Sequence, residues 1–145
     1  MARSDSAIRQ ALRTRLRTVA NLPTVAPVNV ATDQSVKLPY VRDEVLFGAE
    51  LLETRPADGG WVRGVVLYQV DLYYPLGEGP VNADAMARAI CLAFPFGLTL
   101  LDSPPDRLVV PATGGARRFG GFPEDGRYRV PLTITCEHWT TNSLT

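Results

Sequence analysis

The sequence predicts an α+β fold, a two-layer sandwich in which a mainly antiparallel sheet of four to five strands carries two helices on one face. Three stretches predict it: an amphipathic segment at residues 5–20, an alternating segment at 61–74 and an alanine-rich segment at 81–94. Further strand patterns follow each helix. The chain of 145 residues is long enough to build its own core, so we expect a single domain over residues 1–145.

The segment at residues 61–74 is the predicted central strand, because side chains on a strand point in turn to its two faces. Its odd positions mix apolar residues with Arg63, Gln69 and Asp71. One apolar face and one mixed face are typical of an antiparallel sheet, and we expect both helices to cover the apolar face. That face consists of Val62, Val66, Tyr68, Val70, Leu72 and Tyr74.

The first helix is predicted over residues 5–20, where apolar side chains recur at helical spacing until Pro23 stops the pattern. Arg15 falls within the apolar arc of this helix, so it must extend to solvent or bind a carboxylate. The residues that form the arc are Ile8, Leu12, Leu16 and Val19.

Three arginines spaced four residues apart, Arg9, Arg13 and Arg17, follow one flank of this helix. One interpretation is a solvated helix face. The other is a basic stripe that meets an acidic partner or passing DNA. We expect the three charges to act toward partners and to contribute little to folding.

The second helix is predicted over residues 81–94, which follow Pro80 and contain five alanines. Little besides the i,i+4 pair of Asp84 and Arg88 interrupts its apolar surface. A helix this apolar should be covered on more than one side, by the sheet and by the first helix or another chain.

Shorter patterns place the strands before the central one. Residues 22–39 are broken by prolines and support at most one short edge strand. Residues 40–47 predict a strand, which residues 50–55 either extend or leave, and residues 56–60 predict a turn.

The C-terminal part predicts a hairpin of residues 98–101 and 107–110 at a sheet edge, followed later by a last strand over 127–138. Pro131 has no amide proton, so we expect the last strand to be an edge or to bulge there. Residues 140–145 are predicted to be a polar tail.

Residues 113–126 contain five glycines and are predicted to be a long loop that forms no packed element. Their content of Arg117, Arg118, Phe119 and Phe122 is unusual for a passive linker, because exposed phenylalanine beside arginine favours binding. We expect the loop to be mobile in the free chain and to order against a neighbour. The alternative is a disordered surface loop.

The chain offers little chemistry. Fifteen basic and fifteen acidic residues cancel, so the overall balance requires neither nucleic acid nor an anionic membrane as a partner. No stretch has the length of an apolar membrane span or the pattern of a secretory signal, which predicts a protein made in a cytoplasm.

With one histidine and two cysteines, the sequence predicts no catalytic residue, no metal site and no cofactor. Cys136 and His138 lie two residues apart on one strand face, where a thiol–imidazole pair is conceivable but strand-end packing is the simpler interpretation. Both Cys91 and Cys136 lie in apolar patterns, so we expect two reduced thiols.

An ordered series of motifs runs along nearly the whole chain: NLP at 21–23, LPYVR at 38–42, YQVDLYYP at 68–75 with GEG at 77–79, AFP at 93–95 and GRYRVPL at 126–132. This series resembles the tail terminator proteins of long-tailed bacteriophages. Residues 113–126 are not part of the resemblance.

The resemblance implies a structural virion protein and not an enzyme. Such a chain would form a ring, a hexamer, on the last ring of the tail tube, stop tube growth and dock onto a head-completion or neck connector protein. DNA would only pass through its lumen. It would be assembled in the host cytoplasm and lie at the tail–neck junction of the virion, where the loop at 113–126 could contact a neighbouring subunit, the tube or the neck.

Two alternatives stay open from the sequence. One is another tail or neck component, such as a tube or connector protein, with a related fold. The other is a small ligand-binding domain or enzyme on the same sandwich, which would need a pocket with titrating groups.

Overall fold

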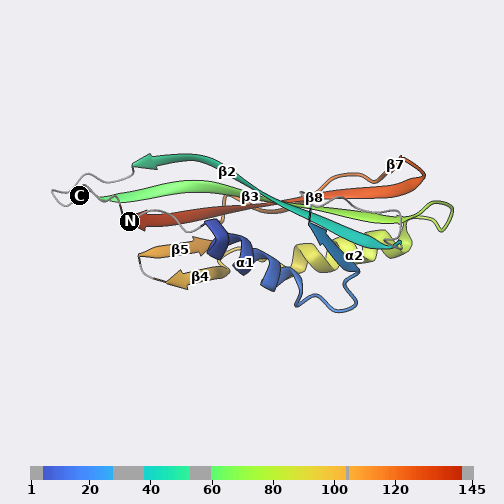
Figure 1. The fold of residues 1–145 in the computed structure, drawn as a ribbon, viewed down its shortest axis with the longest axis horizontal. Coiled ribbons are helices and arrows are strands. Elements are labelled where there is room, and N and C mark those ends of the chain that lie inside the picture. Colours follow the sequence, from blue (N-terminus) through green and yellow to red (C-terminus); the bar gives the residue numbers. More distant parts are fainter. Residues whose placement is uncertain (1–4, 28–37, 53–59, 104, 142–145) are drawn as a thin grey trace.

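The computed structural model describes residues 5–27, 38–52, 60–103 and 105–141, and Figure 1 shows a long sheet with two helices against one of its faces. The elements in chain order are α1 (Asp5–Leu16), β1 (Thr24–Pro27), β2 (Tyr40–Leu52), β3 (Trp61–Pro75), α2 (Val81–Ala93), β4 (Thr99–Ser103), β5 (Asp106–Val109), β6 (Gly115–Arg118), β7 (Phe122–Glu124) and β8 (Arg127–Thr141).

The sheet is mixed and curled, which corrects the predicted antiparallel sandwich of four to five strands. Among the described residues, eight strands join in the order β1-β2-β3-β8-β5-β4, with β6 and β7 also paired to β8. β1 runs parallel to β2. The sheet curls into a half-barrel, so that the β4–β5 hairpin lies in the same layer as α1 (Figure 1). Local alternation predicts where strands are, but it does not record their long-range pairing or the curl of the sheet.

β3 and β8 are the longest strands and pair along their whole length, from Trp61 opposite Thr141 to Pro75 opposite Arg127. This confirms the predicted central strand and last strand. β8 also takes in Thr140 and Thr141 from the predicted tail, while residues 142–145 lie outside the described part of the chain. The other side of β8 is occupied in turn by β7, β6 and β5.

The prediction of a bulge at Pro131 is wrong, whereas the predicted lack of a strand partner at Pro131 holds on one side of β8. β8 is an interior strand, and its register with β3 continues through Pro131, which pairs with Asp71. On the other side of β8, the pairing with β7 ends at Arg129 of β8 and the pairing with β6 starts at Leu132 of β8. The break between β7 and β6 therefore falls opposite the missing amide proton of Pro131. The carbonyl oxygen of Pro131 still accepts a hydrogen bond from the Phe119 amide, 3.0 Å away.

Residues 113–126 contain β6 and β7, so the prediction of a loop without packed elements is wrong. The glycines make this pairing possible. A Cβ on Gly114 would lie 2.8 Å from the backbone oxygen of Thr135, and Gly115 has a φ of +102° under the Phe96 ring. Glycine therefore allows this segment to approach β8 closely, whereas its glycine content alone predicts a loop.

Both helices cover the apolar face of β3, as predicted. The buried core joins Val66, Tyr68, Val70 and Leu72 of that face to side chains of both helices and of β8. Burying each large aliphatic side chain stabilises the fold by about 2 kcal/mol. The contributions to this core are Ile8, Leu12 and Leu16 from α1, Ala83, Ala87 and Ile90 from α2, and Val130, Leu132, Ile134 and Cys136 from β8.

The remaining boundaries agree with the predictions in most places. α1 ends at Leu16 and not at residue 20, β1 is the short edge strand, and residues 50–52 extend β2. The β4–β5 hairpin is present, with β4 at an edge of the sheet. Residues 56–59 of the predicted turn lie outside the described residues.

Candidate assembly surfaces

The cysteines and the histidine are buried or half-buried structural groups. Burial raises the pKa of the Cys136 thiol to about 12 and also raises the pKa of Cys91, so the reactive thiolate is disfavoured at both. The Nε2 atom of His138 lies 3.4 Å from an Asp106 carboxylate oxygen on β5. A nucleophilic thiol–imidazole pair is therefore not supported, and both cysteines are free thiols.

Among the described residues, no group of three or more His, Cys, Asp or Glu side chains is placed to hold a metal ion. Neither of the two described helices combines the length and the apolar character needed to cross a bilayer.

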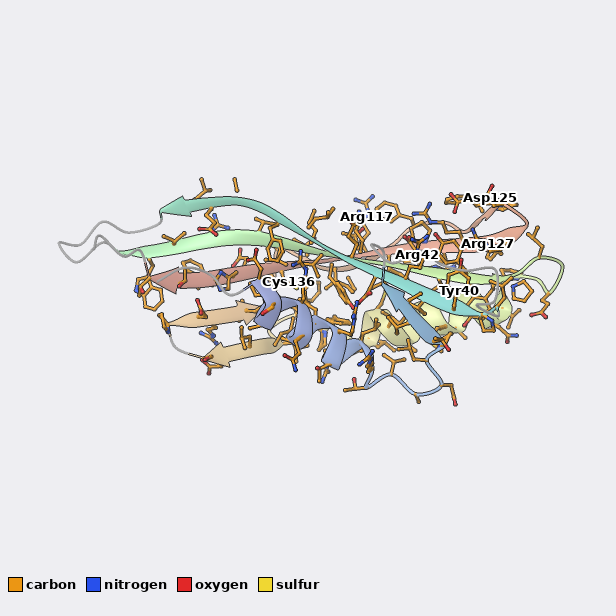
Figure 2. All side chains as sticks on the ribbon, viewed as in Figure 1. Tyr40, Arg42, Arg117, Asp125, Arg127 and Cys136 are labelled. Atoms are coloured by element: carbon orange, nitrogen blue, oxygen red, sulfur yellow. The ribbon has the colours of Figure 1, made fainter. Side chains whose placement is uncertain are left out.

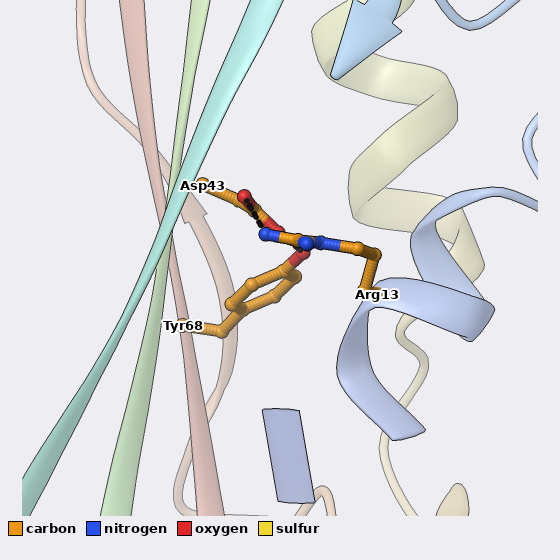
Figure 3. A network of polar contacts seen from close by, with 3 residues as sticks. All are labelled: Arg13, Asp43 and Tyr68. Carbon is orange, nitrogen blue, oxygen red and sulfur yellow. Dashed lines mark hydrogen bonds and ion pairs between the residues drawn. The ribbon is translucent and has the colours of Figure 1, made fainter. Parts of the chain in front are cut away.

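A polar network ties α1 to the sheet (Figure 3). The Arg13 guanidinium donates two hydrogen bonds to the Asp43 carboxylate, from Nε at 3.0 Å and from Nη2 at 2.7 Å. The Tyr68 hydroxyl donates to the same carboxylate at 2.6 Å. Burial, reinforced by the negative charge of Asp43, raises the pKa of Tyr68, and the hydrogen bond to Asp43 raises the pKa of Arg13.

This network separates Arg13 from the other members of the predicted basic stripe. Asp43 is only 5% exposed, and Arg13 is its cationic partner within the fold. In place of the small contribution expected from the sequence, we therefore predict that Arg13 contributes to stability. Arg9 and Arg17 are exposed, and the Arg9 guanidinium lies 5.1 Å from the centre of the Phe47 ring. Helical spacing places three arginines on one flank, but a buried carboxylate from β2 is paired with Arg13.

Arg15 binds a backbone carbonyl group of α2. It donates a hydrogen bond from Nε to the backbone oxygen of Ala93, 2.7 Å away, and not to a carboxylate. Ala93 is the last residue of α2, and the last carbonyl groups of a helix have no intrahelical partners, while the helix dipole favours a cation beside them. The contact therefore links the two helices and caps the end of α2.

The four residues predicted to bind a partner in the segment 113–126 are divided between the two faces of the sheet. We call the face away from the helices the outer face. Arg117 lies there, with its guanidinium 5.0 Å from the centre of the Phe119 ring. Arg118 is the next residue on the strand, so it points the other way and forms an ion pair with Asp84 on α2.

Phe122 of β7 lies opposite Arg129 of β8, and the Arg129 guanidinium is 5.7 Å from the centre of the Phe122 ring. Phe119 and Phe122 are 42% and 40% exposed. We call Arg117, Phe119 and Phe122 the β6–β7 surface.

A cluster of charged side chains next to the β6–β7 surface was not predicted. Arg129 pairs with Asp71 at 3.1 Å and with Glu124 at 3.0 Å. Burial raises the pKa of Asp71, and the charge of Arg129 opposes that rise. These residues come from β3, β7 and β8, so only the strand register could have brought them together in a prediction.

Two tyrosines next to this cluster are covered by a cation. Tyr40 and Tyr73 stack with their ring centres 4.8 Å apart. The Arg127 guanidinium lies 4.8 Å from the Tyr73 ring centre and donates a hydrogen bond to the Tyr40 hydroxyl. Figure 2 shows Arg117, Arg42, Arg127 and Asp125 in the same half of the molecule as Tyr40.

A groove of about 670 Å³ lies toward the opposite end of the sheet. Its walls include both tryptophans, Trp61 and Trp139, together with carboxylates and one arginine. The remaining lining residues are Gly97, Asp102, Pro105, Asp106, Arg107, Val109, Val110, Pro111, Ala112 and Glu137.

Comparisons with known proteins cover nearly the whole fold. A family model described as phage tail terminator protein matches residues 7–135, from α1 into β8. One solved structure has the same fold over 94% of this chain and 96% of its own chain, with a TM-score of 0.67 and 23% sequence identity. No curated protein matches the sequence.

Proposed function

Because the chain belongs to the phage tail terminator family, we propose that it forms a ring on the end of the tail tube, stops tube growth and provides the surface on which the head or neck docks. The observation that carries the proposal is the family match over residues 7–135. The ring is proposed to be a hexamer of a long-tailed phage, assembled in the host cytoplasm and placed at the tail–neck junction. The role is structural and not enzymatic.

The β6–β7 surface is proposed to contact the tube, the neck or an adjacent subunit. Two phenylalanine rings are about 40% exposed there, beside Arg117 and Arg129. Aromatic residues and arginine are enriched at protein interfaces. Arg118 is the least suited of the four predicted binding residues, because Asp84 already pairs with it.

Arg9 and Arg17 are proposed to face a partner or the lumen through which DNA passes. Both lie on the exposed flank of α1, unlike Arg13, which is bound to Asp43. Exposed arginines attract phosphates without reading sequence, which suits a surface that DNA passes.

The test is to produce particles without this chain and to restore it afterwards. Without it, electron microscopy should show tail tubes of uncontrolled length that do not join heads. Adding the purified chain to growing tubes should give a single tail length and restore joining. Normal tails in its absence would contradict the proposal, and a purified chain that polymerises into tubes would instead indicate a tube protein.

A further inference from the structure

The helix α2 exposes an apolar stripe on the side away from the core. Val81 is 74% exposed and Leu92 is 66% exposed, and Ala85 and Arg88 between them are also exposed. These four positions recur at helical spacing, opposite the buried side chains of the same helix. We call Val81, Ala85, Arg88 and Leu92 the helix patch. Its arginine forms no ion pair with another described residue.

A second apolar region lies on the outer face of the sheet, where β2 and β3 pair beyond the charged cluster. Four large apolar side chains in this region are 36–56% exposed, and one of them, Trp61, also lines the groove. The strand register places them together, because Leu46 pairs with Leu67 and Leu51 pairs with Arg63. We call this region the sheet patch, and it consists of Leu46, Leu51, Trp61 and Val65.

An exposed carboxylate borders the sheet patch. Glu44 lies two residues before Leu46 on β2, so both side chains are on the outer face. Within the described part of the chain Glu44 has no ion-pair partner. The helix patch therefore contains a cation and the sheet patch a neighbouring anion.

We propose that the helix patch of one copy packs on the sheet patch of the next copy, with Arg88 facing Glu44. The inference rests on the ring of the proposed function and assigns its subunit contact. The two patches differ and lie on opposite layers of the molecule, with α2 in the helical layer and the sheet patch on the outer face (Figure 1). A contact between two different surfaces is head-to-tail and forms a ring when the rotation between copies closes, whereas a two-fold dimer uses the same surface twice.

A second copy accounts for both patches together. Covering both patches with the tube and the neck would need two different partner surfaces, whereas each junction between copies buries one patch from each chain. The same contact supplies the further cover that the apolar composition of α2 predicts.

The first experiment introduces one acidic residue into each patch, Leu92→Asp in the helix patch and Leu51→Asp in the sheet patch. Both side chains are more than half exposed, so the fold should be retained. Native mass spectrometry and light scattering, in solution and on isolated tail tubes, should show that each variant loses the ring. We expect at least about a tenfold weaker association, because an unpaired carboxylate would be buried in the contact.

Mixing the two variants gives the decisive measurement. The intact helix patch of the Leu51→Asp chain should bind the intact sheet patch of the Leu92→Asp chain and give a one-to-one dimer that cannot grow. Leu76→Asp is the control, because Leu76 is 46% exposed and belongs to neither patch, and it should keep the ring. A mixture that stays monomeric would overturn the inference.

The charges provide a second test. Arg88→Glu should weaken the ring, and Glu44→Arg in the same chain should restore it, since every junction then contains the reversed pair. A double variant no better than Arg88→Glu would overturn the pairing. A ring that survives both patch substitutions would overturn only this contact, whereas a wild-type chain that stays monomeric in solution and on tubes would overturn the proposed ring as well.

Discussion

Arg13 on α1 and Asp43 on β2 are thirty residues apart in sequence and form a two-pronged ion pair with N–O distances of 2.7 and 3.0 Å. The Asp43 carboxylate is buried and also accepts a hydrogen bond from the Tyr68 hydroxyl on β3. One acidic group therefore connects α1 to the neighbouring strands β2 and β3. Arg13 is therefore an internal residue of the domain, although its spacing with Arg9 and Arg17 is that of a surface stripe.

We expect Arg13→Gln to lower the free energy of unfolding by about 1–3 kcal/mol, because Asp43 would remain buried without its cation. The Arg13 side chain is 34% exposed, which places the effect below that of a fully buried pair. Urea unfolding measures the change. Arg17→Gln is the matched control on the same helix and should change stability by less than about 0.5 kcal/mol. Equal effects of the two substitutions would contradict the assignment.

Two glycines, one at the start of β6 and one just after it, provide a second prediction. Gly115→Ala should destabilise the protein by about 1–3 kcal/mol, because an alanine at a φ of +102° is strained and its Cβ would meet the Phe96 ring. At Gly120 no atom lies within 4 Å of an added Cβ, so Gly120→Ala should be neutral or stabilise by up to about 1 kcal/mol. Thermal unfolding of the two variants compares them directly, and a neutral Gly115→Ala would contradict the strain assigned to this position.

The elements that could be predicted from the sequence are those whose side-chain period records a buried face. Apolar and mixed positions alternate over residues 61–74, which form β3 in the structure. Ile8, Leu12 and Leu16 recur at helical spacing and form the buried side of α1. Such periodicity arises because all side chains on one face of a helix or strand pack into the core and are therefore apolar. The structure buries these same residues.

The features that could not be predicted depend on contacts between distant parts of the chain. The parallel pairing of β1, the curl of the sheet and the choice of Asp43 as the partner of Arg13 leave no local pattern. β7 is different, because a usable signal was present. Asp125 and Gly126 both have positive φ and form the two-residue turn between β7 and β8, and an Asp-Gly pair is a strong hairpin signal.

The burial of Cys136 predicts a pH effect on stability. Burial raises the folded pKa of this thiol from 9.0 to about 12, so the protonated form is favoured by folding. Its contribution is fully present below pH 9 and is lost as the pH rises from about 9 toward 12, since the unfolded chain then releases the proton first. Cys136→Val should show a shallower alkaline loss of stability than the wild-type chain. Urea unfolding from pH 7 to 11 measures the difference, and parallel curves would contradict it.

Thiol labelling gives an independent prediction for the two cysteines. At pH 8 the native protein should react slowly at Cys136, which is buried, and faster at Cys91, which is half-buried. After denaturation without reductant, two thiols should be titrated. Mass spectrometry of the labelled peptides distinguishes the sites, and rapid native labelling of Cys136 would show that β8 opens readily.

The last prediction concerns the β6–β7 surface, where neighbouring arginines on one strand provide a matched pair. Arg117 lies on the outer face against Phe119, whereas Arg118 faces α2 and pairs with Asp84. If the outer face of β6 contacts the tube, the neck or an adjacent subunit, Arg117→Ala with Phe119→Ser should leave thermal unfolding nearly unchanged and reduce tube capping or head joining several-fold.

Arg118→Ala should have the opposite profile, with a stability loss of up to about 1 kcal/mol, as expected for an exposed ion pair, and normal assembly. Tail length by electron microscopy and the yield of joined particles read out assembly, and urea unfolding reads out stability. If Arg118→Ala impairs assembly as much as the outer-face variant does, the two faces of β6 are not functionally distinct, and the binding role cannot be assigned to the β6–β7 surface.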